Sequence, residues 1–592
     1  MASNPWELAQ ERAGLLRWST FVQAGMVMKL LSHPAGLRRA ARLLRAAGVT
    51  KVYLDLFRGL MTSEPVLASA RDFLRAQGFL VSAGITTVAG RGQGTPSTHG
   101  GPWLCYSARN TRELLAQVMR RGGRLFDEII VDDFLATMCR CPACTRGRGG
   151  RSWGEFYSDQ LVEVARRCLL EPAREENPKV RVIIKYPQWY DRFHCFGYDV
   201  RRHPAQFDQV WAGTETRDPE VEYVHQYQAF NNYRWLAEVA GEKMAGAWFD
   251  QLNTSPEVYV EQAYQSVLAG APEIILFSYD ERQFGPANPQ LRLLRQHLPR
   301  LYRLAELVRG RRRLGIPAYK PPDSEGGDEA YLYDYLGMFG LPVLPTPHFP
   351  TGPAAIFPRQ AAADPALAAG LRSFLEGGGM ALLTAGALEA LAADWRLLAE
   401  LGYGEHPTTP LDRWACRFQV GRQRHDGPGW VRFGRRLHPV RGEVVASALA
   451  EQETFPILTA ADACAGRALV LSARTLEYAP ESTRVTIKEP VPLIHLADGV
   501  VEELRRQMLA PLGLRLRAPA RVGLYLFEGG PIVLENFKEV PAPVELNLDP
   551  AAWPPGEWQE VLAGLPVVQE AGTCRLLLER RTCAALMPRR EP

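Results

Sequence analysis

Three cysteines stand close together in the segment Cys139-Arg-Cys141-Pro-Ala-Cys144, a C-x-C-x-x-C pattern. Thiolates at this spacing can occupy three corners of a tetrahedral zinc site, which then needs a fourth ligand from elsewhere in the chain. Cys105, in the preceding segment WLCYS, is the natural fourth ligand. Four thiolates leave no open coordination position, so we expect a structural Zn²⁺ on Cys105, Cys139, Cys141 and Cys144. Loop cysteines without a metal are the alternative.

A second group of residues consists of acids that follow apolar, strand-like runs. Asp132 and Asp133 follow EIIV, Glu215 ends QVWAGTE, and Asp250 lies in MAGAWFDQL. Glycosidic bond hydrolysis needs two carboxyl groups, one to protonate the leaving oxygen and one to act as nucleophile or base. These four acids are therefore the candidate catalytic residues, with loop capping or an arginine salt bridge as the alternative for Asp133 and Glu215. Adjacent strand residues point to opposite sides, so we expect only one of Asp132 and Asp133 to face the site.

Other polar and aromatic residues near the same strand ends are candidates for substrate binding. Cationic side chains can hydrogen-bond hydroxyl groups or bind an acidic sugar, and indole rings can stack on the C–H faces of sugars. The simpler alternatives are ion pairing with the acids and ordinary packing. The candidates are Asp55, Arg58, His99, Lys185, Trp189, Trp211, Arg217, Trp248 and Asp280.

The elements that carry these residues alternate regularly between about residues 18 and 310. Strand-like runs occupy 17–27, 51–57, 79–88, 128–134, 180–189, 209–215, 244–252 and 273–280. Helical patterns occupy 36–48, 69–78, 111–123, 156–170, 257–270 and 288–310. This alternation predicts an α/β fold with an N-terminal (β/α)8 TIM barrel, whose strands end at one rim where active sites lie. An open doubly wound sheet is the alternative, but no Gly-rich phosphate turn follows the first run. We expect the Gly-rich segment 89–110 to be a working loop.

The composition and the pattern of apolar residues change twice after the predicted barrel. Residues 311–325 are rich in Arg, Pro and Gly, and a further α/β pattern continues from there to a helix over 499–513. From about residue 517, short alternating runs with turns between them predict a small antiparallel β domain. The expected domains are therefore 1–312, a catalytic barrel, 313–515, a second α/β domain, and 516–592, a C-terminal β domain.

Composition excludes several classes of function. The chain has 592 residues, 23% of them charged, and a formal net charge of +4, which is too small to favour nucleic acid or an anionic membrane as partner. It contains no uncharged apolar run of eighteen residues, and its first residues do not resemble a signal peptide. We therefore expect a cytoplasmic protein with reduced cysteines.

Together these features resemble glycoside hydrolase family 42, the β-galactosidases. The C-x-C-x-x-C pattern with an upstream cysteine is similar to the zinc cluster of many members. The segments YLYDYLGMFGLPVLP and FLEGGGMALLTAG resemble the family's second domain, a glutamine-amidotransferase-like (flavodoxin-like) α/β fold without amidotransferase chemistry. In that family the domain helps to build trimers and a small β domain follows it. The resemblance thus implies a homo-oligomer, with a trimer favoured.

The sequence departs from the family where catalysis would take place. The family has an Asn-Glu pair after strand four and a Glu nucleophile on strand seven, whereas this chain has Asp132-Asp133 and Asp250. Transfer by position would make Asp133 or Asp132 the acid/base and Asp250 the nucleophile. A second assignment is similar to α-glycosidase barrels, with Asp133 or Asp132 as nucleophile and Glu215 as acid/base near Lys185. We favour the second assignment, because it explains Glu215 without requiring two substitutions.

The sequence therefore predicts a glycoside hydrolase that cleaves small oligosaccharides or glycosides with two carboxylates, by a retaining mechanism. Zn²⁺ is the only expected cofactor, with no organic cofactor. A transglycosylase or lyase on the same acids and a non-catalytic carbohydrate-binding barrel are the alternatives. An amidotransferase is disfavoured, because Thr384-Ala385-Gly386 has no cysteine where a nucleophile would stand.

Overall fold

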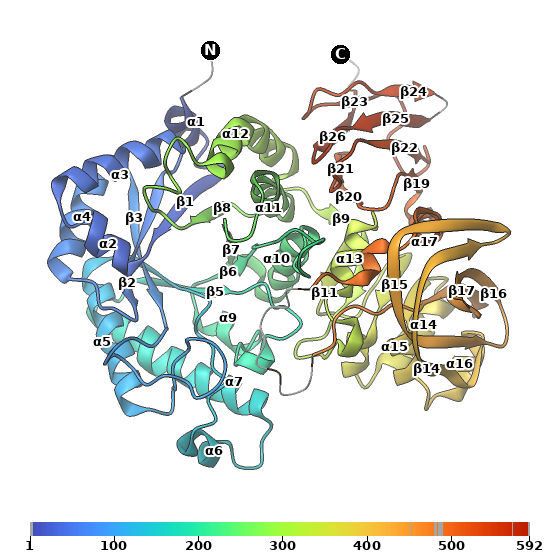
Figure 1. Cartoon of the computed structure of the whole chain (residues 1–592), viewed down its shortest axis with the longest axis horizontal. Coiled ribbons are helices and arrows are strands. Elements are labelled where there is room, and N and C mark those ends of the chain that lie inside the picture. The colour runs from blue at the N-terminus through green and yellow to red at the C-terminus, as the bar shows by residue number, and fades with distance from the viewer. Residues whose placement is uncertain (1–3, 452, 479–481, 483–488, 571, 590–592) are drawn as a thin grey trace. The chain divides into compact units, whose positions relative to one another are not determined.

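A computed structural model describes residues 4–451, 453–478, 482, 489–570 and 572–589 (Figure 1). The chain forms two compact units. The first contains residues 1–218, 236–306 and 482–487, and the second contains residues 219–235, 307–481 and 488–592. Each expected domain boundary stays a prediction.

The first unit is built on a closed barrel of parallel strands (Figure 1). Within the described residues its strands are β1 (Arg17–Val22), β2 (Lys51–Arg58), β3 (Leu80–Thr86), β4 (Glu128–Val131), β5 (Arg181–Tyr186), β6 (Gln209–Gly213), β7 (Met244–Asp250) and β8 (Glu273–Phe277). β8 pairs in parallel with β1, which closes the barrel. This confirms the predicted (β/α)8 barrel and excludes the open sheet.

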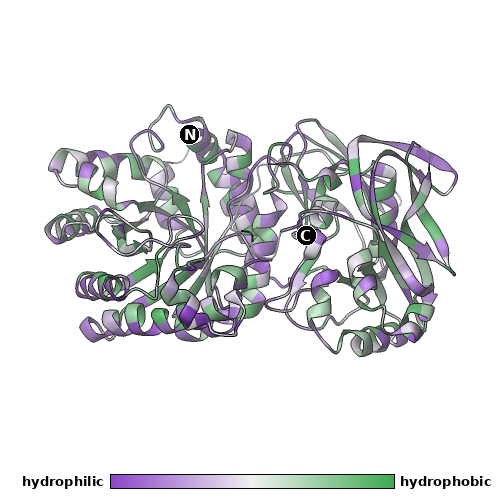
Figure 2. Cartoon of the chain, turned by 60° about the horizontal axis from the view of Figure 1, so that its bottom comes forward, coloured by the Kyte–Doolittle hydropathy of each residue, from purple (hydrophilic) through white to green (hydrophobic). Residues whose placement is uncertain are grey.

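Helices alternate with these strands along the chain. They are α1 (Pro5–Glu11), α2 (Ala24–Leu30), α3 (Pro34–Ala46), α4 (Glu64–Ala76), α5 (Arg109–Leu125), α6 (Pro142–Arg148), α7 (Trp153–Val164), α8 (Glu171–Glu176), α9 (Arg202–Gln206), α10 (Tyr227–Ala240), α11 (Pro256–Ala269) and α12 (Pro289–Val308). In α3, for example, Leu37, Ala40, Ala41 and Leu44 recur at helical spacing and are buried. Helices of this kind show hydrophobic and hydrophilic residues side by side, whereas the barrel strands are largely hydrophobic (Figure 2). No described helix is both long and apolar enough to cross a membrane.

Large side chains fill the barrel interior. Phe21, Tyr53, Trp211 and Trp248 pack there with isoleucines from β4, β5 and β8. A Cβ atom at Gly246 would lie 2.3 Å from the Trp211 ring, so the glycine makes room for the indole. The ring of Trp211 is thereby fixed inside the barrel.

An ion network crosses the barrel near the start of its strands. Lys51 Nζ on β2 lies 2.7 Å from Glu128 Oε1 on β4 and 3.1 Å from Glu273 Oε2 on β8. The Tyr53 hydroxyl hydrogen-bonds to both glutamates. These buried groups satisfy one another's hydrogen bonds, and they fill this end of the barrel.

The first strand is shorter than predicted. The apolar run 17–27 was expected to be one strand, but β1 ends at Val22 and α2 begins at Ala24. The carboxylate of Asp55 accepts a hydrogen bond of 3.2 Å from the Ala24 amide. A carboxylate at this position stabilises a helix N-terminus, which hydrophobicity alone does not reveal.

The second unit contains a nine-stranded mixed sheet, counted over the described residues, in the order β11-β10-β12-β13-β18-β17-β16-β14-β15. Its strands are β10 (Ile316–Tyr319), β11 (Val343–Thr346), β12 (Ala354–Phe357), β13 (Met380–Thr384), β14 (Tyr403–Val420), β15 (Gln423–Pro439), β16 (Glu443–Leu449), β17 (Thr454–Ala463) and β18 (Gly466–Leu471). Its helices are α13 (Leu332–Met338), α14 (Leu367–Glu376), α15 (Ala385–Ala390), α16 (Trp395–Glu400) and α17 (Asp498–Leu509). The long β14–β15 hairpin was not predicted.

Two smaller antiparallel sheets complete this unit. One has the order β19-β22-β25-β24 and the other β23-β26-β21-β20-β9. Their strands are β9 (Arg313–Leu314), β19 (Leu514–Arg517), β20 (Val522–Phe527), β21 (Ile532–Asn536), β22 (Ala542–Leu548), β23 (Trp558–Glu560), β24 (Val568–Glu570), β25 (Thr573–Leu578) and β26 (Cys583–Pro588). β9 pairs with β20, so a strand from the start of the second α/β segment joins a C-terminal sheet.

Candidate active site

A cavity of about 470 Å³ lies in the barrel unit. It is lined by Gln23, Arg58, Gly101, Pro102, Trp103, Asp132, Asp133, Phe134, Lys185, Gln188, Trp189, Glu215, Trp248, Asp250, Leu252 and Phe277. Most of these residues lie at or just after the carboxyl ends of the parallel strands, the position at which barrel enzymes hold their active sites. All four predicted catalytic acids are among them.

Lys185 on β5 is the centre of this acid cluster. Its ammonium contacts the carboxylate of Asp133 and lies 2.7 Å from Glu215 Oε1 and 3.9 Å from Asp132 Oδ1. Burial disfavours the charged ammonium, but the three carboxylates outweigh burial and raise the pKa of Lys185. Lys185 is therefore a permanent cation shared by two of the candidate acids.

Asp133 and Glu215 hold protons more tightly than exposed acids do. Burial, opposed by Lys185, raises the pKa of Asp133 to about 8, and nearby Asp132 and Glu215 add to the shift. Burial also raises the pKa of Glu215, with Asp250 as the neighbouring carboxylate that adds to it. Perturbation of this kind by burial and like charges is typical of groups that exchange protons during catalysis.

The backbone just before Glu215 makes room for its carboxylate. A Cβ atom at Gly213 would lie 2.4 Å from Glu215 Oε2 and 3.1 Å from the amide nitrogen of Gln188. Glu215 Oε2 is buried and has no hydrogen-bond partner among the described residues. This oxygen is thus enclosed by the backbone of β6.

Asp132 is held from the other side by Arg58. Arg58 Nη2 donates a 2.7 Å hydrogen bond to Asp132, and its Nε donates a 3.3 Å hydrogen bond to Asp55. Asp132 also accepts hydrogen bonds from the Thr86 hydroxyl and from the amide of Asp133. Asp132 and Asp133 both line the cavity, so the expectation that only one of them faces it was wrong: both residues follow β4 and leave its strict alternation.

Asp250 is paired with a different cation. Arg217 Nη1 lies 3.1 Å from Asp250 Oδ1, and the same oxygen accepts a 2.8 Å hydrogen bond from the amide of Leu252. Asp250 therefore lies in the same cavity as Glu215 but pairs with Arg217, whereas Glu215 pairs with Lys185.

Aromatic side chains form much of the cavity wall. Trp189 and Trp248 were predicted, whereas Trp103, Phe134 and Phe277 were not. Trp103 packs edge-on against Trp189 with ring centroids 6.3 Å apart. Its place in the Gly-rich loop 89–110 was a signal that could have identified it. The same strand-end rule applied to β1 and β5 could have identified Gln23 and Gln188.

Five predicted substrate-binding residues do not line the cavity, namely Asp55, His99, Trp211, Arg217 and Asp280. Asp55 is fully buried beneath Arg58, and burial raises its pKa to about 7. Trp211 packs in the barrel interior, and Arg217 pairs with the cavity residue Asp250. His99 is exposed beside Thr98, and Asp280 accepts hydrogen bonds from the amides of Arg282 and Gln283 in a turn.

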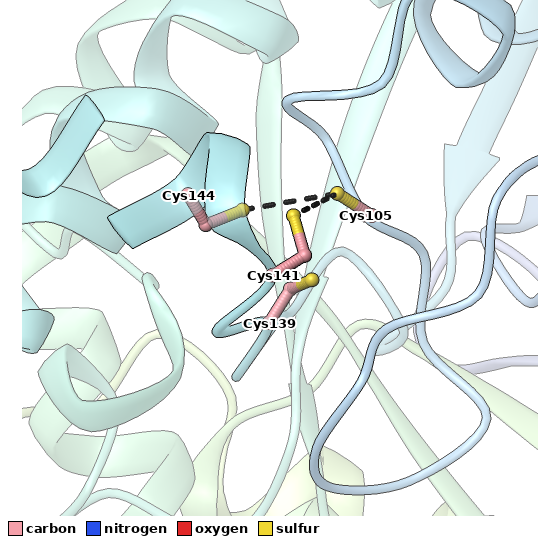
Figure 3. Close-up of side chains that lie close together, drawn as sticks. All are labelled: Cys105, Cys139, Cys141 and Cys144. Atoms are coloured by element: carbon pink, nitrogen blue, oxygen red, sulfur yellow. Dashed lines mark hydrogen bonds between the residues drawn. The ribbon is translucent and has the colours of Figure 1, made fainter. Parts of the chain in front are cut away.

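The four predicted metal ligands converge as expected (Figure 3). Cys105 Sγ lies 3.7 Å from both Cys141 Sγ and Cys144 Sγ, and the four sulfurs lie within 4.8 Å of one another. Metal–sulfur bonds of about 2.3 Å in a tetrahedron require sulfur atoms about 3.8 Å apart. The cluster therefore fits a metal ion held by four thiolates.

The cluster joins two segments that reach the cavity. Cys105 lies in the same loop as Trp103, and Cys139, Cys141 and Cys144 follow the Asp132-Asp133 pair. Trp153, Phe156 and Tyr157 pack around the sulfurs. A metal here would hold these two segments together.

Comparison with known proteins agrees with this arrangement. A family model described as "Probable glycosyl hydrolase, catalytic domain" matches residues 4–323. An uncharacterized protein of Saccharolobus solfataricus is 23% identical over 342 residues, which cover 52% of this chain and 56% of that protein. The chain thus spans little more than half the length of this curated relative.

Solved structures share the fold along nearly the whole chain. The β-galactosidase from Bacillus circulans sp. alkalophilus has a TM-score of 0.65 at 12% identity and covers 97% of this chain and 99% of its own. The β-galactosidase from Rahnella sp. R3 has a TM-score of 0.66 at 14% identity, covering 98% and 99%. The α-L-fucosidase isoenzyme 2 from Paenibacillus thiaminolyticus has a TM-score of 0.65 at 13% identity, covering 97% and 100%.

These likenesses are to the fold, and they confirm the resemblance to family 42 β-galactosidases at that level. The family model covers more than half of the chain, including every acid of the cavity. The chain therefore belongs to the family of probable glycosyl hydrolase catalytic domains.

Proposed function

We propose that this protein is a retaining glycoside hydrolase in which Asp133 is the nucleophile and Glu215 is the acid/base. The observation that carries the proposal is the single ammonium of Lys185 in contact with both carboxylates inside an aromatic cavity. Glycosidases need two such carboxyl groups, held at a defined separation on either side of the scissile bond.

The shared lysine bears on stereochemistry. Hydrogen bonds to an ammonium are about 2.7–3.2 Å long, so two oxygens bound to one nitrogen lie no more than about 6 Å apart. Retaining enzymes place their carboxyl groups about 5–5.5 Å apart, whereas inverting enzymes need about 6.5–9.5 Å to admit a water. The geometry around Lys185 supports retention.

The two carboxyl groups differ in a way that supports their roles. Glu215 binds Lys185 through Oε1, and burial raises the pKa of its carboxyl group, so a protonated Glu215 can donate its proton to the leaving oxygen. Asp133 would then attack the anomeric carbon and form a glycosyl ester. Glu215, now ionised, would take a proton from water as the water hydrolyses that ester.

The cavity supports a small substrate. Its volume of about 470 Å³ lies in the lower half of the range for small-molecule sites, about 300–1,000 Å³. Trp103, Trp189 and Trp248 offer faces on which sugar rings can stack. Oligosaccharides or simple glycosides therefore fit this proposal better than a continuous polymer.

The same proposal assigns Zn²⁺ to the four cysteines. The sulfur separations and the thiolate donor set fit tetrahedral zinc, and the closed set of ligands supports a structural role. The ion would hold Cys105 and its loop against the segment after β4. No step of hydrolysis uses it.

The test is hydrolysis of aryl glycosides by wild type, Glu215→Gln, Asp133→Asn and Asp250→Asn proteins. The panel includes β-galactosides and α-L-fucosides, the sugars named for the structural neighbours. We expect Glu215→Gln to lower kcat by about 10²–10⁴-fold, the usual contribution of an acid/base group. Asp280→Asn is the matched control, because Asp280 lies near the strand ends but does not line the cavity.

Azide distinguishes the two roles. It should restore turnover to both variants, giving a glycosyl azide of the substrate's anomeric configuration with Glu215→Gln and of the opposite configuration with Asp133→Asn. Opposite configuration from Asp250→Asn instead would move the nucleophile to β7. Absence of any hydrolysis by wild type across the panel would contradict the proposal.

A further inference from the structure

The β14–β15 hairpin belongs to the second unit (Figure 1). It carries two exposed tryptophans. Trp414 is 45% exposed and Trp430 is 52% exposed, whereas the adjacent residues Ala415 and Val431 are buried. Trp414 pairs across the hairpin with Arg432, and Trp430 precedes Arg432 by two residues. Because side chains alternate along a strand, both indoles lie on the outer face and are diagonal neighbours.

These indoles line a second cavity of about 520 Å³, separate from the one in the barrel. Its lining consists of Arg413, Trp414, Trp430, Ala450, Glu451 and Glu453. Large aromatic side chains that stay exposed beside a concave polar surface mark a site of interaction. A molecule that fits this hollow would have both apolar faces and many polar groups.

The charges around the indoles are balanced and fixed. Arg432 donates two hydrogen bonds, of 2.8 and 3.0 Å, to Asp412. Arg413 donates a 2.9 Å hydrogen bond to Glu453, which Arg436 also contacts. These three arginines are matched by three carboxylates, Asp412, Glu453 and Glu451 of the cavity lining, so the surface offers no excess charge to a polyanion. It offers ordered donors and acceptors to a neutral, polyhydroxylated molecule.

We propose that this surface is a carbohydrate-binding site for a neutral oligosaccharide. The apolar faces of pyranose rings would stack on Trp414 and Trp430, while the paired arginine and carboxylate groups would hydrogen-bond the ring hydroxyls. The site lies wholly in the second unit and shares no residue with the barrel cavity. It therefore does not depend on the proposed hydrolysis.

The test uses affinity electrophoresis of the full chain in gels that contain soluble galactan, xylan or amylose. The double variant W414A/W430A is compared with wild type and with Trp395→Ala, a matched control because Trp395 is 65% exposed on α16 of the same unit. We expect at least one polysaccharide to retard wild type and Trp395→Ala, and the dissociation constant to rise at least tenfold in the double variant. W414Y/W430Y should retain binding, since tyrosine keeps an aromatic face. Melting temperatures of all variants verify folding.

Several results would overturn the proposal. The proposal is wrong if none of the three polysaccharides retards wild type. It is also wrong if W414A/W430A is retarded as strongly as wild type. Light scattering that shows a smaller assembly for W414A/W430A than for wild type would assign the surface to contact between copies of the chain. Hydrolysis of aryl glycosides, measured on the same proteins, should be unchanged in the double variant. Retardation of Glu215→Gln, together with loss of its hydrolysis, would separate this site from the barrel.

Discussion

At the scale of single residues, the barrel site is organised by cations placed between acids. Lys185 lies between Asp133 and Glu215, and Arg58 lies between Asp55 and Asp132. The strand-end rule predicts these acids from sequence, because every carboxyl end of a parallel barrel meets one rim. The pairing itself was not predictable, since it depends on the tilt and stagger of neighbouring strands. Trp211 illustrates the limit. It lies on a barrel strand, as predicted, but its side chain packs in the barrel interior and does not line the cavity.

Lys185→Met tests the role of the shared cation. Removal of the ammonium leaves two buried carboxyls without their counter-charge, so the pKa values of Asp133 and Glu215 should rise further. The nucleophile would then ionise only at higher pH, and the acid limb of the kcat/KM profile should move up by one unit or more, on the order of 1.4 kcal/mol.

Lys51→Met is the control for that experiment. Lys51 is also buried and paired with two glutamates, but it lies at the start of β2. Its loss should lower stability and leave the pH profile in place. Equal profiles for wild type and Lys185→Met would show that the lysine does not set the ionisation of the site.

Gly213→Ala tests the space that Glu215 requires. The added Cβ would lie 2.4 Å from the carboxylate oxygen and 3.1 Å from a backbone nitrogen, so the acid must move. A displacement of about 1 Å can cost about 10²-fold in rate. We expect kcat to fall by one to two orders of magnitude, while Gly150→Ala, where a Cβ meets nothing within 4 Å, leaves it unchanged. Full activity in Gly213→Ala would show that Glu215 takes no part in the reaction.

At the scale of elements, the cavity depends on a loop with little regular structure of its own. Residues 87–108 connect β3 to α5 and contain isolated bridges such as Val88 to Trp103 and Pro96 to Leu104. The four-cysteine cluster ties the end of this loop to the segment after β4. The sequence predicted both the loop and the cluster, because closely spaced cysteines and glycines are local signals. That Trp103 packs against Trp189 could not be predicted, since the contact joins distant segments.

Cys141→Ser tests the metal and its structural role. Wild-type protein purified without chelators should contain about one zinc per chain by mass spectrometry, and the variant should contain much less. Since binding energy contributes to folding, the melting temperature of the variant should fall, and kcat/KM should fall with the loss of the ordered loop. Cys464→Ser, at an exposed cysteine outside the cluster, is the control. Zinc-free wild type with an unchanged melting temperature after chelation would contradict the assignment.

At the scale of the whole molecule, the sequence predicts the barrel better than it predicts the second unit. Buried parallel strands read as continuous apolar runs, whereas β14 and β15 mix arginine, proline and glycine with few buried positions. The grouping of residues 219–235 with the second unit follows from long-range contacts that no local pattern encodes. The trimer and the amidotransferase-like character of the second domain stay predictions.

The free energy of unfolding of the whole chain should depend on pH because of its buried acids. The pKa of Asp133 is about 8 in the folded chain against an ordinary value of 3.8, so the folded chain binds this proton more tightly than the unfolded chain. The stability contributed by this group is complete below pH 3.8 and is lost as pH rises towards 8.

Asp133→Asn removes that dependence. As the pH rises from 5 to 8.5, the free energy of unfolding, measured with urea, should fall in wild type relative to the variant. One pKa unit corresponds to about 1.4 kcal/mol, so the change is measurable. Parallel loss of stability in both proteins over this range would show that Asp133 ionises normally.

Ion pairs around the barrel cavity join five carboxyl groups to three cationic side chains. Once all five carboxyl groups are ionised, above the raised pKa values of Asp55 and Asp133, this imbalance attracts positive charge, which glycosidic bond cleavage develops on the sugar ring in its transition state. An iminosugar, whose ring nitrogen is protonated, would therefore bind more tightly than the neutral sugar of the same shape. Its affinity would weaken as the pH falls and the carboxylates take up protons. The cavity is thus a natural target for amine-bearing inhibitors.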